Sequence, residues 1–324
     1  MKAYQFTNPS RGLEYVEVPI PAPQNNQVLV EIKATGLCHT DCNIISGKEN
    51  TFFWKRPIIL GHEIAGQIVA IGSDVTKFKV GDRVVSLIGT EHPITFEDVT
   101  TSPGIGINGG FAEKVLMFDF KALHIPEGVT FAQAAVATDA IATAYHAVVA
   151  EGQISASSKI AIIGLGGLGL SAAQIASHYG AKVYGIEIDT RKYAPAAQAG
   201  VHACAKSLKG FAGIGFDVII DFVGAESTTA EAAKAVKRGG KVVIVGLSQK
   251  MVILDRQEFV TLGVTLNGSA GASKEEVQKC LEMVANKEID PLLEEIPFGQ
   301  IREGLDRISH GDVIGRLYAD PTRA

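Results

Sequence analysis

The sequence has little of what marks a membrane protein, a disulfide scaffold or a nucleic-acid binder. No apolar run reaches the roughly 18 residues of a membrane span, and the first residues lack the apolar core of a signal peptide, so we expect a cytoplasmic protein. The four cysteines, Cys38, Cys42, Cys204 and Cys280, are too widely spaced for a disulfide framework and are expected to be reduced thiols or metal ligands. With 30 Lys and Arg against 35 Asp and Glu, the chain has no basic footprint for nucleic acid.

What is present is an ordinary globular composition with abundant glycine. The chain has 324 residues, enough for two domains, with 46% hydrophobic and 20% charged residues. This composition excludes a disordered chain, a collagen and a coiled coil. The 35 glycines recur at the ends of short Val/Ile-rich runs, where chain reversals and close ligand approach need them.

The first 140 or so residues have a β pattern. Short alternating runs at 28–32 and 65–70 are broken by Gly, Pro and Asn. The stretch 89–110 is polar and rich in Thr and Gly, and we expect a surface loop there. Its ionisable residues are expected to be solvated: Glu91, His92, Glu97 and Asp98.

From about residue 150, strands and helices alternate. Nearly continuous apolar strands are expected at 159–163, 182–188, 216–221 and 241–245, and helical stretches separate them. This alternation predicts an α/β fold with a doubly wound parallel sheet buried on both faces. Pro195 interrupts the expected second helix, so a late start or a kink is expected there.

A glycine-rich turn follows the first of these strands. Gly164-Leu165-Gly166-Gly167-Leu168-Gly169 matches G-x-G-x-x-G and opens an amphipathic helix, which is the context of a dinucleotide-binding turn. Gly164 permits the tight turn, Gly166 lets the backbone approach the pyrophosphate, and Gly169 allows close helix–strand packing. The helix N-terminus supplies free N–H groups for the phosphates. The alternative is a structural turn in another α/β domain.

The residue at the end of the second strand bears on cofactor choice. A Glu187 carboxylate can accept hydrogen bonds from both adenosine-ribose hydroxyls and repels a 2′-phosphate, which favours NAD over NADP. Arg191 and Lys192 follow closely and could hold a phosphate instead. The inference also fails if Glu187 points to solvent.

The first half contains two soft or borderline metal ligands, Cys38 and His62. Their separation is far from zinc-finger spacing and is more typical of a catalytic site assembled from distant segments. Taken singly, a lone Cys and a lone His are more often core residues.

The motifs together resemble the zinc-dependent medium-chain alcohol dehydrogenase superfamily over nearly the full length. They are G-x-C-H-T-D at 36–41, G-H-E-x-A-G at 61–66, G-D-R-V at 81–84, G-G-F-A-E at 109–113, the glycine-rich turn and G-R at 315–316. The resemblance implies a mostly-β GroES-like catalytic domain over 1–145 and 285–324. It also implies a Rossmann-type dinucleotide-binding domain over 146–284.

The resemblance also implies a metal site. Cys38 and His62 match the first two zinc ligands, and Asp139 stands where relatives commonly have a third, Cys ligand. Aspartate binds zinc through oxygen. Glu63 matches a residue that can enter the coordination sphere, and Asp41 matches a carboxylate that orients His62, although a turn-forming Asp is the alternative. The structural zinc lobe of relatives carries four Cys that this chain lacks, so one zinc is expected.

Further roles follow from the same resemblance. Thr40 matches the hydroxyl that takes the substrate proton, and Asn43 replaces a frequent relay His, which leaves the outer end of that relay in doubt. The remaining cofactor contacts are expected from His39 and Arg316 at the pyrophosphate, Thr143 at the nicotinamide ring, and the stretch near that ring formed by Val223, Val245, Gly246 and Leu247.

The resulting functional hypothesis is an NAD-linked, zinc-dependent alcohol dehydrogenase or carbonyl reductase that forms a homodimer or homotetramer. An NADPH-linked, zinc-free reductase of activated carbonyls or double bonds is the alternative, and a non-enzymatic nucleotide-sensing role is a third. Phe52, Phe53 and Trp54 favour a medium or aromatic alcohol if they line the pocket, although such clusters are more often core or interface.

Overall fold

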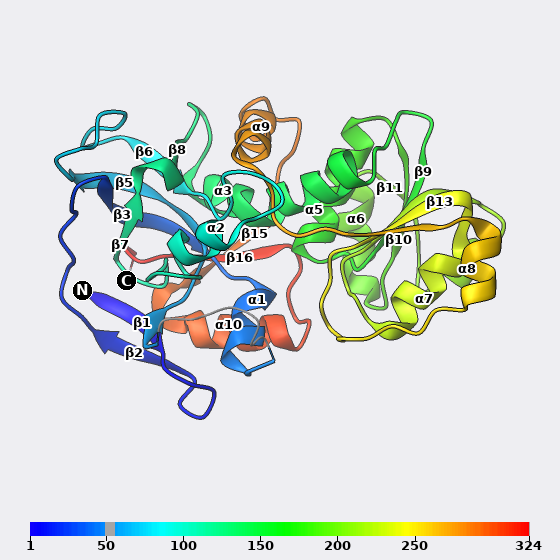
Figure 1. Ribbon diagram of the computed structural model, residues 1–324, viewed down its shortest axis with the longest axis horizontal. Coiled ribbons are helices and arrows are strands. Elements are labelled where there is room, and N and C mark those ends of the chain that lie inside the picture. The colour runs from blue at the N-terminus through cyan, green and yellow to red at the C-terminus, as the bar shows by residue number, and fades with distance from the viewer. Residues whose placement is uncertain (49–55, 324) are drawn as a thin grey trace. The chain divides into compact units, whose positions relative to one another are not determined.

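The computed structural model describes residues 1–48 and 56–323, which fold as two compact units (Figure 1). Unit 1 comprises Met1–Ala142, Gly271–Lys287 and Leu292–Ala324. Unit 2 comprises Thr143–Ala270 and Glu288–Pro291. The predicted Phe52, Phe53 and Trp54 pocket lies outside the described residues. No helix among the residues that are described is long and apolar enough to cross a bilayer.

Unit 1 is built on a seven-stranded sheet in the order β15-β16-β3-β5-β6-β8, with β7 paired to β3. The strands are β3 (Gln27–Gly36), β5 (Glu63–Ile71), β6 (Arg83–Ser86), β7 (Lys114–Phe118), β8 (Ala122–His124), β15 (Leu293–Pro297) and β16 (Arg316–Asp320). β3 and β5 pair antiparallel, and Val30, Ile32, Ile64 and Ile68 from this pair share one buried core cluster. The mostly-β fold expected for the N-terminal half is confirmed.

A second, three-stranded sheet and several helices complete unit 1. The sheet has the order β2-β1-β4, and its strands are β1 (Lys2–Phe6), β2 (Leu13–Glu17) and β4 (Ile58–Ile59). The helices that bear on the site are α1 (His39–Ile45), α3 (Phe131–Val136) and α10 (Ile301–Ser309). α1 contacts α10, and α3 covers β3 and β5. These contacts fix the segment that follows β3 and the segment that enters β5.

The stretch 89–110 is not simply a solvated loop. It contains the helix α2 (Phe96–Thr101), and Asp98 on that helix is 3% exposed, so the expectation that Asp98 is solvated is wrong. Its carboxylate accepts hydrogen bonds from the amides and hydroxyls of Thr90 and Thr95 and pairs with buried Lys121 at 2.6 Å. Burial alone would make Asp98 costly, and these donors compensate it. Glu91 and Glu97 are exposed, as expected.

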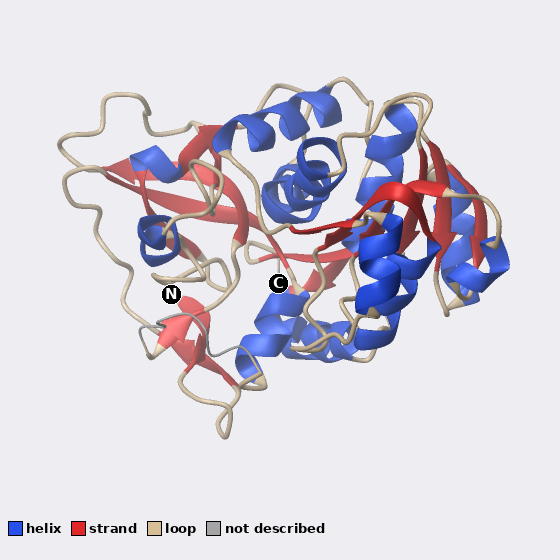
Figure 2. Ribbon diagram, turned by 45° about the vertical axis from the view of Figure 1, so that its right-hand side comes forward, coloured by secondary structure: helices blue, strands red, loops and turns tan. Residues whose placement is uncertain are grey.

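Unit 2 is a six-stranded, all-parallel sheet in the order β11-β10-β9-β12-β13-β14. The strands are β9 (Lys159–Ile163), β10 (Lys182–Ile186), β11 (Val201–Ala205), β12 (Phe216–Asp221), β13 (Val236–Ile244) and β14 (Thr265–Gly268). The helices are α5 (Gly167–His178), α6 (Tyr193–Gln198), α7 (Glu226–Ala235) and α8 (Arg256–Leu262). Figure 2 shows helices flanking the strands of this sheet.

The two faces of the unit 2 sheet are covered by different helices. Ile163 belongs to a core cluster that includes Ala232 of α7, whereas Ile162 faces Gly169 of α5 from the opposite side. The predicted doubly wound, Rossmann-type sheet is therefore confirmed. Pro195 lies near the start of α6, after the short 3₁₀ turn Thr190–Lys192, which matches the expected late start.

The boundary between the units differs from the predicted one on the C-terminal side. We expected residues up to 284 to belong to the dinucleotide-binding domain, but Gly271–Lys287, including α9 (Lys274–Ala285), groups with unit 1. α9 packs against the π-helical turn Ala137–Ile141, and the Lys274 amide donates to the Thr90 carbonyl at 3.2 Å. These tertiary contacts leave no local signal in the sequence.

Candidate metal centre and dinucleotide-binding turn

Cys38 and His62 are placed by the ends of two paired strands of unit 1. β3 ends at Gly36, and Cys38 then caps α1 with an extended backbone. His62 directly precedes β5 and follows Gly61, whose φ of +86° and contact with Phe111 leave no room for a side chain. Cys38 is 6% exposed and His62 3% exposed.

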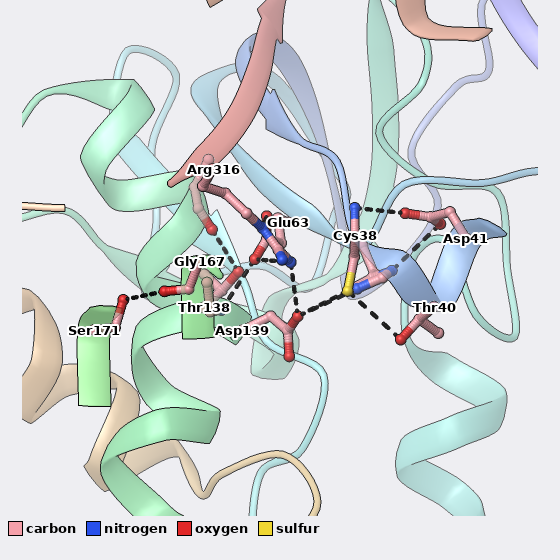
Figure 3. Close-up of polar contacts among 12 residues, drawn as sticks. Cys38, Thr40, Asp41, Glu63, Thr138, Asp139, Gly167, Ser171 and Arg316 are labelled. Carbon is pink, nitrogen blue, oxygen red and sulfur yellow. Dashed lines mark hydrogen bonds and ion pairs between the residues drawn. The ribbon is translucent and has the colours of Figure 1, made fainter. Parts of the chain in front are cut away.

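Asp139 approaches from a third segment, the π-helical turn Ala137–Ile141. Single π-helical turns occur frequently at functional sites. The Asp139 Oδ2 atom lies 3.4 Å from Cys38 Sγ (Figure 3). The same atom lies 3.5 Å from His62 Nε2. One ligand atom from each of the three residues lies within 4.8 Å of the other two. Three segments that are distant in the sequence therefore converge on one point.

These distances fit a zinc ion. Zinc–ligand bond lengths of about 2.0–2.3 Å at tetrahedral angles put a sulfur and an oxygen ligand about 3.6 Å apart, and a nitrogen and an oxygen ligand about 3.4 Å apart. The observed separations of 3.4 and 3.5 Å are close to these values. The thiol, imidazole and carboxylate set also matches the ligand types that zinc accepts. Cys38, His62 and Asp139 therefore could hold one zinc ion.

The electrostatic environment of Cys38, His62 and Asp139 also favours a bound cation. Burial disfavours the imidazolium of His62, but Asp41 and Asp139 outweigh it and raise the pKa of His62 well above its ordinary value. Asp41 is fully buried, and its Oδ1 lies 3.5 Å from His62 Nδ1, the position for a carboxylate that orients a ligand histidine. A negative field that favours an imidazolium favours a divalent cation as well.

Glu63 is held away from this ligand group. Its two carboxylate oxygens accept from Arg316 Nε at 3.0 Å and from a terminal Arg316 nitrogen at 2.8 Å, and the Ala140 amide also donates at 3.0 Å. Burial raises the pKa of Glu63 to about 7, although Arg316 opposes this shift. The expected entry of Glu63 into the metal sphere would require breaking a bidentate, charge-assisted pair.

Arg316, expected at the pyrophosphate, is paired with carboxylates of unit 1. Its guanidinium donates to Asp139 Oδ2 at 3.2 Å in addition to Glu63, and Figure 3 shows it between these two carboxylates. The buried Arg316 guanidinium is thus paired with the carboxylates of Glu63 and Asp139, which both belong to unit 1. His39, the other residue expected at the pyrophosphate, is exposed at the start of α1. Thr40 is also exposed, and its hydroxyl lies 3.5 Å from Cys38 Sγ.

The glycine-rich turn of unit 2 has the geometry that its sequence predicts. Gly164 has φ +87°, and a Cβ on Gly169 would lie 1.9 Å from the Gly164 carbonyl oxygen. Gly166 caps α5 with open space where a side chain would be, which leaves room for a ligand against the backbone. Gly167 and Leu168 form the first turn of α5.

Glu187 faces this turn and not the solvent. It is 7% exposed, and its carboxylate accepts from the Leu165 amide and the Asp189 amide, both at 3.0 Å. Lys192 Nζ lies 3.3 Å from the same carboxylate, and Arg191 pairs with Asp189 at 2.9 Å. Both cations that could hold a 2′-phosphate are thus already paired with carboxylates.

The remaining expected cofactor residues of unit 2 lie around the carboxyl ends of the strands. Val223 follows β12, Val245 and Gly246 follow β13, and Leu247 is 72% exposed. Thr143, at the start of unit 2, is 5% exposed. Sequence reasoning missed Asp221, a fully buried carboxylate at the end of β12. An aspartate that ends an apolar strand was the available signal.

Comparison with known proteins matches both units. Residues 24–127 match the family described as "Alcohol dehydrogenase GroES-like domain", and residues 167–286 match "Zinc-binding dehydrogenase". An alcohol dehydrogenase of Geobacillus stearothermophilus is 30% identical, with 98% of each chain covered. A D-arabinose 1-dehydrogenase (NADP(+)) of Saccharolobus solfataricus is 30% identical over 96% of this chain and 95% of its own. The structure of acetophenone reductase from Geotrichum candidum in complex with NAD has a TM-score of 0.90 at 30% identity, covering 98% of this chain and 96% of its own.

Proposed function

The chain belongs to the zinc-dependent medium-chain alcohol dehydrogenase superfamily, and from this premise we propose that it interconverts an alcohol and an aldehyde or ketone by hydride transfer with NAD(H). The observation that carries the zinc-dependent form of this proposal is the converging group of Cys38, His62 and Asp139. The reaction uses this group in unit 1 and the dinucleotide-binding turn in unit 2. The substrate is a small alcohol or carbonyl compound.

Cys38, His62 and Asp139 would hold one catalytic zinc ion in this proposal. When bound, zinc supplies a Lewis acid that lowers the pKa of a hydroxyl or polarises a carbonyl. The Asp41 carboxylate, 3.5 Å from His62 Nδ1, orients the ring electrostatically, and Nε2 lies 3.5 Å from Asp139 Oδ2. The Glu63–Arg316 ion pair helps to hold Asp139 in place, because the Arg316 guanidinium also pairs with the Asp139 carboxylate.

Thr40 is the proposed residue for handling the substrate proton. Its hydroxyl is exposed and lies beside Cys38, so it can accept a proton from a substrate hydroxyl and pass it on. Asn43, one turn further along α1, cannot titrate, so the proton does not leave through that side chain. His39 is proposed to contact the cofactor pyrophosphate. The nicotinamide supplies the hydride chemistry when bound.

NAD is the proposed cofactor because of Glu187. Its carboxylate lies against the glycine-rich turn, where it can accept from ribose hydroxyls and repel a 2′-phosphate. Lys192 and Arg191 are paired with Glu187 and Asp189, which offsets their attraction for a phosphate. The NADP(+)-linked D-arabinose relative makes NADP the specific alternative to test.

Replacing Cys38 tests the metal assignment. Cys38→Ser should lose bound zinc and alcohol-dependent NADH formation together, measured by elemental analysis and absorbance on purified protein. Cys42→Ser is the matched control, because Cys42 lies on the same helix, contacts the Leu305 carbonyl and has a pKa raised to about 12 by burial, and so offers no ready thiolate. Zinc-free wild-type protein with full activity would overturn the proposal in favour of a zinc-free reductase.

A further inference from the structure

Asp221 stands at the junction of three turns in unit 2. It ends β12, and in the sheet register it lies level with Ile163 of β9 and Ile244 of β13. Gly164 follows Ile163, and Val245 follows Ile244. The side chain of Asp221 is fully buried at this edge. One carboxylate therefore occupies the place from which the glycine-rich turn and two neighbouring turns depart.

The carboxylate of Asp221 is saturated by donors from its own turn. Oδ1 accepts from the amides of Val223 and Gly224, both at 2.9 Å. Oδ2 accepts from the hydroxyls of Thr228 and Thr229, both at 2.8 Å. The side chain thus ties the backbone after β12 to the first turns of α7, and a buried charge accepts four hydrogen bonds.

The main chain of Asp221 holds the next turn. Its carbonyl oxygen accepts from the amides of Val245 and Gly246 at 2.9 and 3.0 Å. The two turns then run against each other without space for side chains, because a Cβ on Gly224 would lie 1.8 Å from the Gly246 carbonyl oxygen. A Cβ on Gly164 would lie 2.8 Å from the Val223 side chain. Movement of the Asp221 turn would therefore move all three turns.

We propose that Asp221 is a positioning residue for the dinucleotide, which sets the backbone at Val223, Val245 and Gly246 relative to the glycine-rich turn. This inference rests on the proposed function, in which a dinucleotide binds at the glycine-rich turn; the family resemblance assigns Val223, Val245 and Gly246 to the same cofactor. Asp221 itself touches no cofactor in this account. It acts by holding the turns at the carboxyl edge of the sheet in one conformation before the cofactor binds. Binding then does not have to order these turns, so less conformational entropy is lost.

The chemistry of the four donors predicts a graded response to substitution. In Asp221→Asn, the amide oxygen can still accept from the Val223 and Gly224 amides, and the amide nitrogen can donate to threonine hydroxyls, which rotate to accept. Asp221→Ala removes both side-chain acceptor oxygens and leaves the part-buried Val223 amide and the buried Gly224 amide without this partner. We expect NADH binding to weaken by about 10-fold or more in the alanine variant and by only about 2–3-fold in the asparagine variant, because small displacements of positioning groups have large effects.

The experiment is direct NADH titration by fluorescence on the full chain, with circular dichroism and thermal melting on the same samples. Asp217→Asn is the matched control, because Asp217 lies at the other end of β12, where it accepts from the Lys159 amide at 2.7 Å and pairs with Lys237. It should reduce stability without changing NADH affinity. If Asp221→Ala does not fold, Thr229→Val removes one donor to Oδ2 and should weaken binding by about 2–5-fold, and Thr229→Ser should restore it.

The outcomes separate this inference from the proposed function. Wild-type affinity in folded Asp221→Ala or Thr229→Val protein, or an equal loss in Asp217→Asn, would overturn the positioning role and leave the proposed function standing. A wild-type protein that binds NADPH but not NADH would overturn the NAD assignment only, and the same variants are then compared with NADPH. A wild-type protein that binds neither dinucleotide would overturn both.

Discussion

Removing the Asp98 carboxylate should destabilise unit 1 strongly, although Asp98 lies in a stretch with a polar, loop-like sequence. The Lys121 side chain is fully buried, and its Nζ lies 2.6 Å from Asp98 Oδ1 and 2.6 Å from the Ile88 carbonyl. Burial and the hydrogen bond to Asp98 act in opposite directions on Lys121, and the net effect lowers its pKa. Without Asp98, the ammonium group keeps only the carbonyl as a partner.

The magnitude follows from the burial of the pair. Breaking a buried ion pair by removing one partner costs about 3–5 kcal/mol, because the other charge is left uncompensated. Asp98→Ala also loses the acceptor for Thr90 and Thr95, which adds about 1 kcal/mol for the lost reciprocal half of the capping box of α2, whose N-cap is Thr95. For a cooperative unit of this size, each kcal/mol lowers the melting temperature by about 2–4 °C. We therefore expect the melting temperature to fall by about 8–24 °C.

A double-mutant cycle measured by calorimetry gives the sharpest test. Lys121→Met should cost less than Asp98→Ala, because the carboxylate keeps its threonine donors. Asp98→Asn combined with Lys121→Met should be more stable than the sum of its single changes by about 1.5 kcal/mol or more, since no unpaired charge remains. Additivity within about 0.5 kcal/mol would refute the idea that the pair acts as a unit.

The pH dependence of this contribution has a definite sign. Burial opposes ionisation of Asp98, but hydrogen bonds from Lys121 and Thr95 outweigh it and hold its pKa well below the ordinary value. A carboxyl group with a lowered folded-state pKa stabilises fully above its unfolded pKa, about 3.9, and this stabilisation is lost as the pH falls toward the folded value. The difference in unfolding free energy between wild type and Asp98→Asn should stay constant from pH 8 to 5 and shrink below about pH 4.

Two further predictions concern the proposed site. Glu187→Ala should lower the NAD-to-NADP ratio of kcat/KM by about 10- to 100-fold, the equivalent of about 1.5–3 kcal/mol for a hydrogen bond to a charged group; an unchanged ratio, or an equal change in Asp189→Asn, would contradict the ribose assignment. Thr40→Ala should slow turnover by about 100-fold or more with nearly unchanged NADH affinity, as expected for loss of a proton-transfer group, and Thr40→Ser should recover most of the rate. Stopped-flow hydride transfer and NADH titration separate the two effects, and full turnover in Thr40→Ala would rule out the proton role.

Local features of this protein followed from the sequence alone. The strands β9, β10, β12 and β13 of unit 2 could be placed from hydrophobic periodicity and glycine positions, because both depend on neighbours within one or two turns. The outer strands β11 and β14 were not predicted. The glycine-rich turn is the strongest case, since Gly164 needs a positive φ and Gly169 cannot carry a side chain against the Gly164 carbonyl. Cys38 and His62 could be chosen as candidate ligands from the motifs around them.

The sequence by itself determined the β-rich first half, the alternating α/β second half, the glycine-rich turn and the candidate ligands Cys38 and His62, because residue type and short-range spacing carry that information. Only the tertiary structure decided which partner each charged group has. Arg316 pairs with Glu63, 253 residues away in the sequence. Asp98 is buried and forms an ion pair with Lys121, and the Asp221 carboxylate accepts a hydrogen bond from the Val223 amide of the turn that follows it. The pairing and burial of a carboxylate depend on which distant segments converge around it, and no local pattern records that convergence.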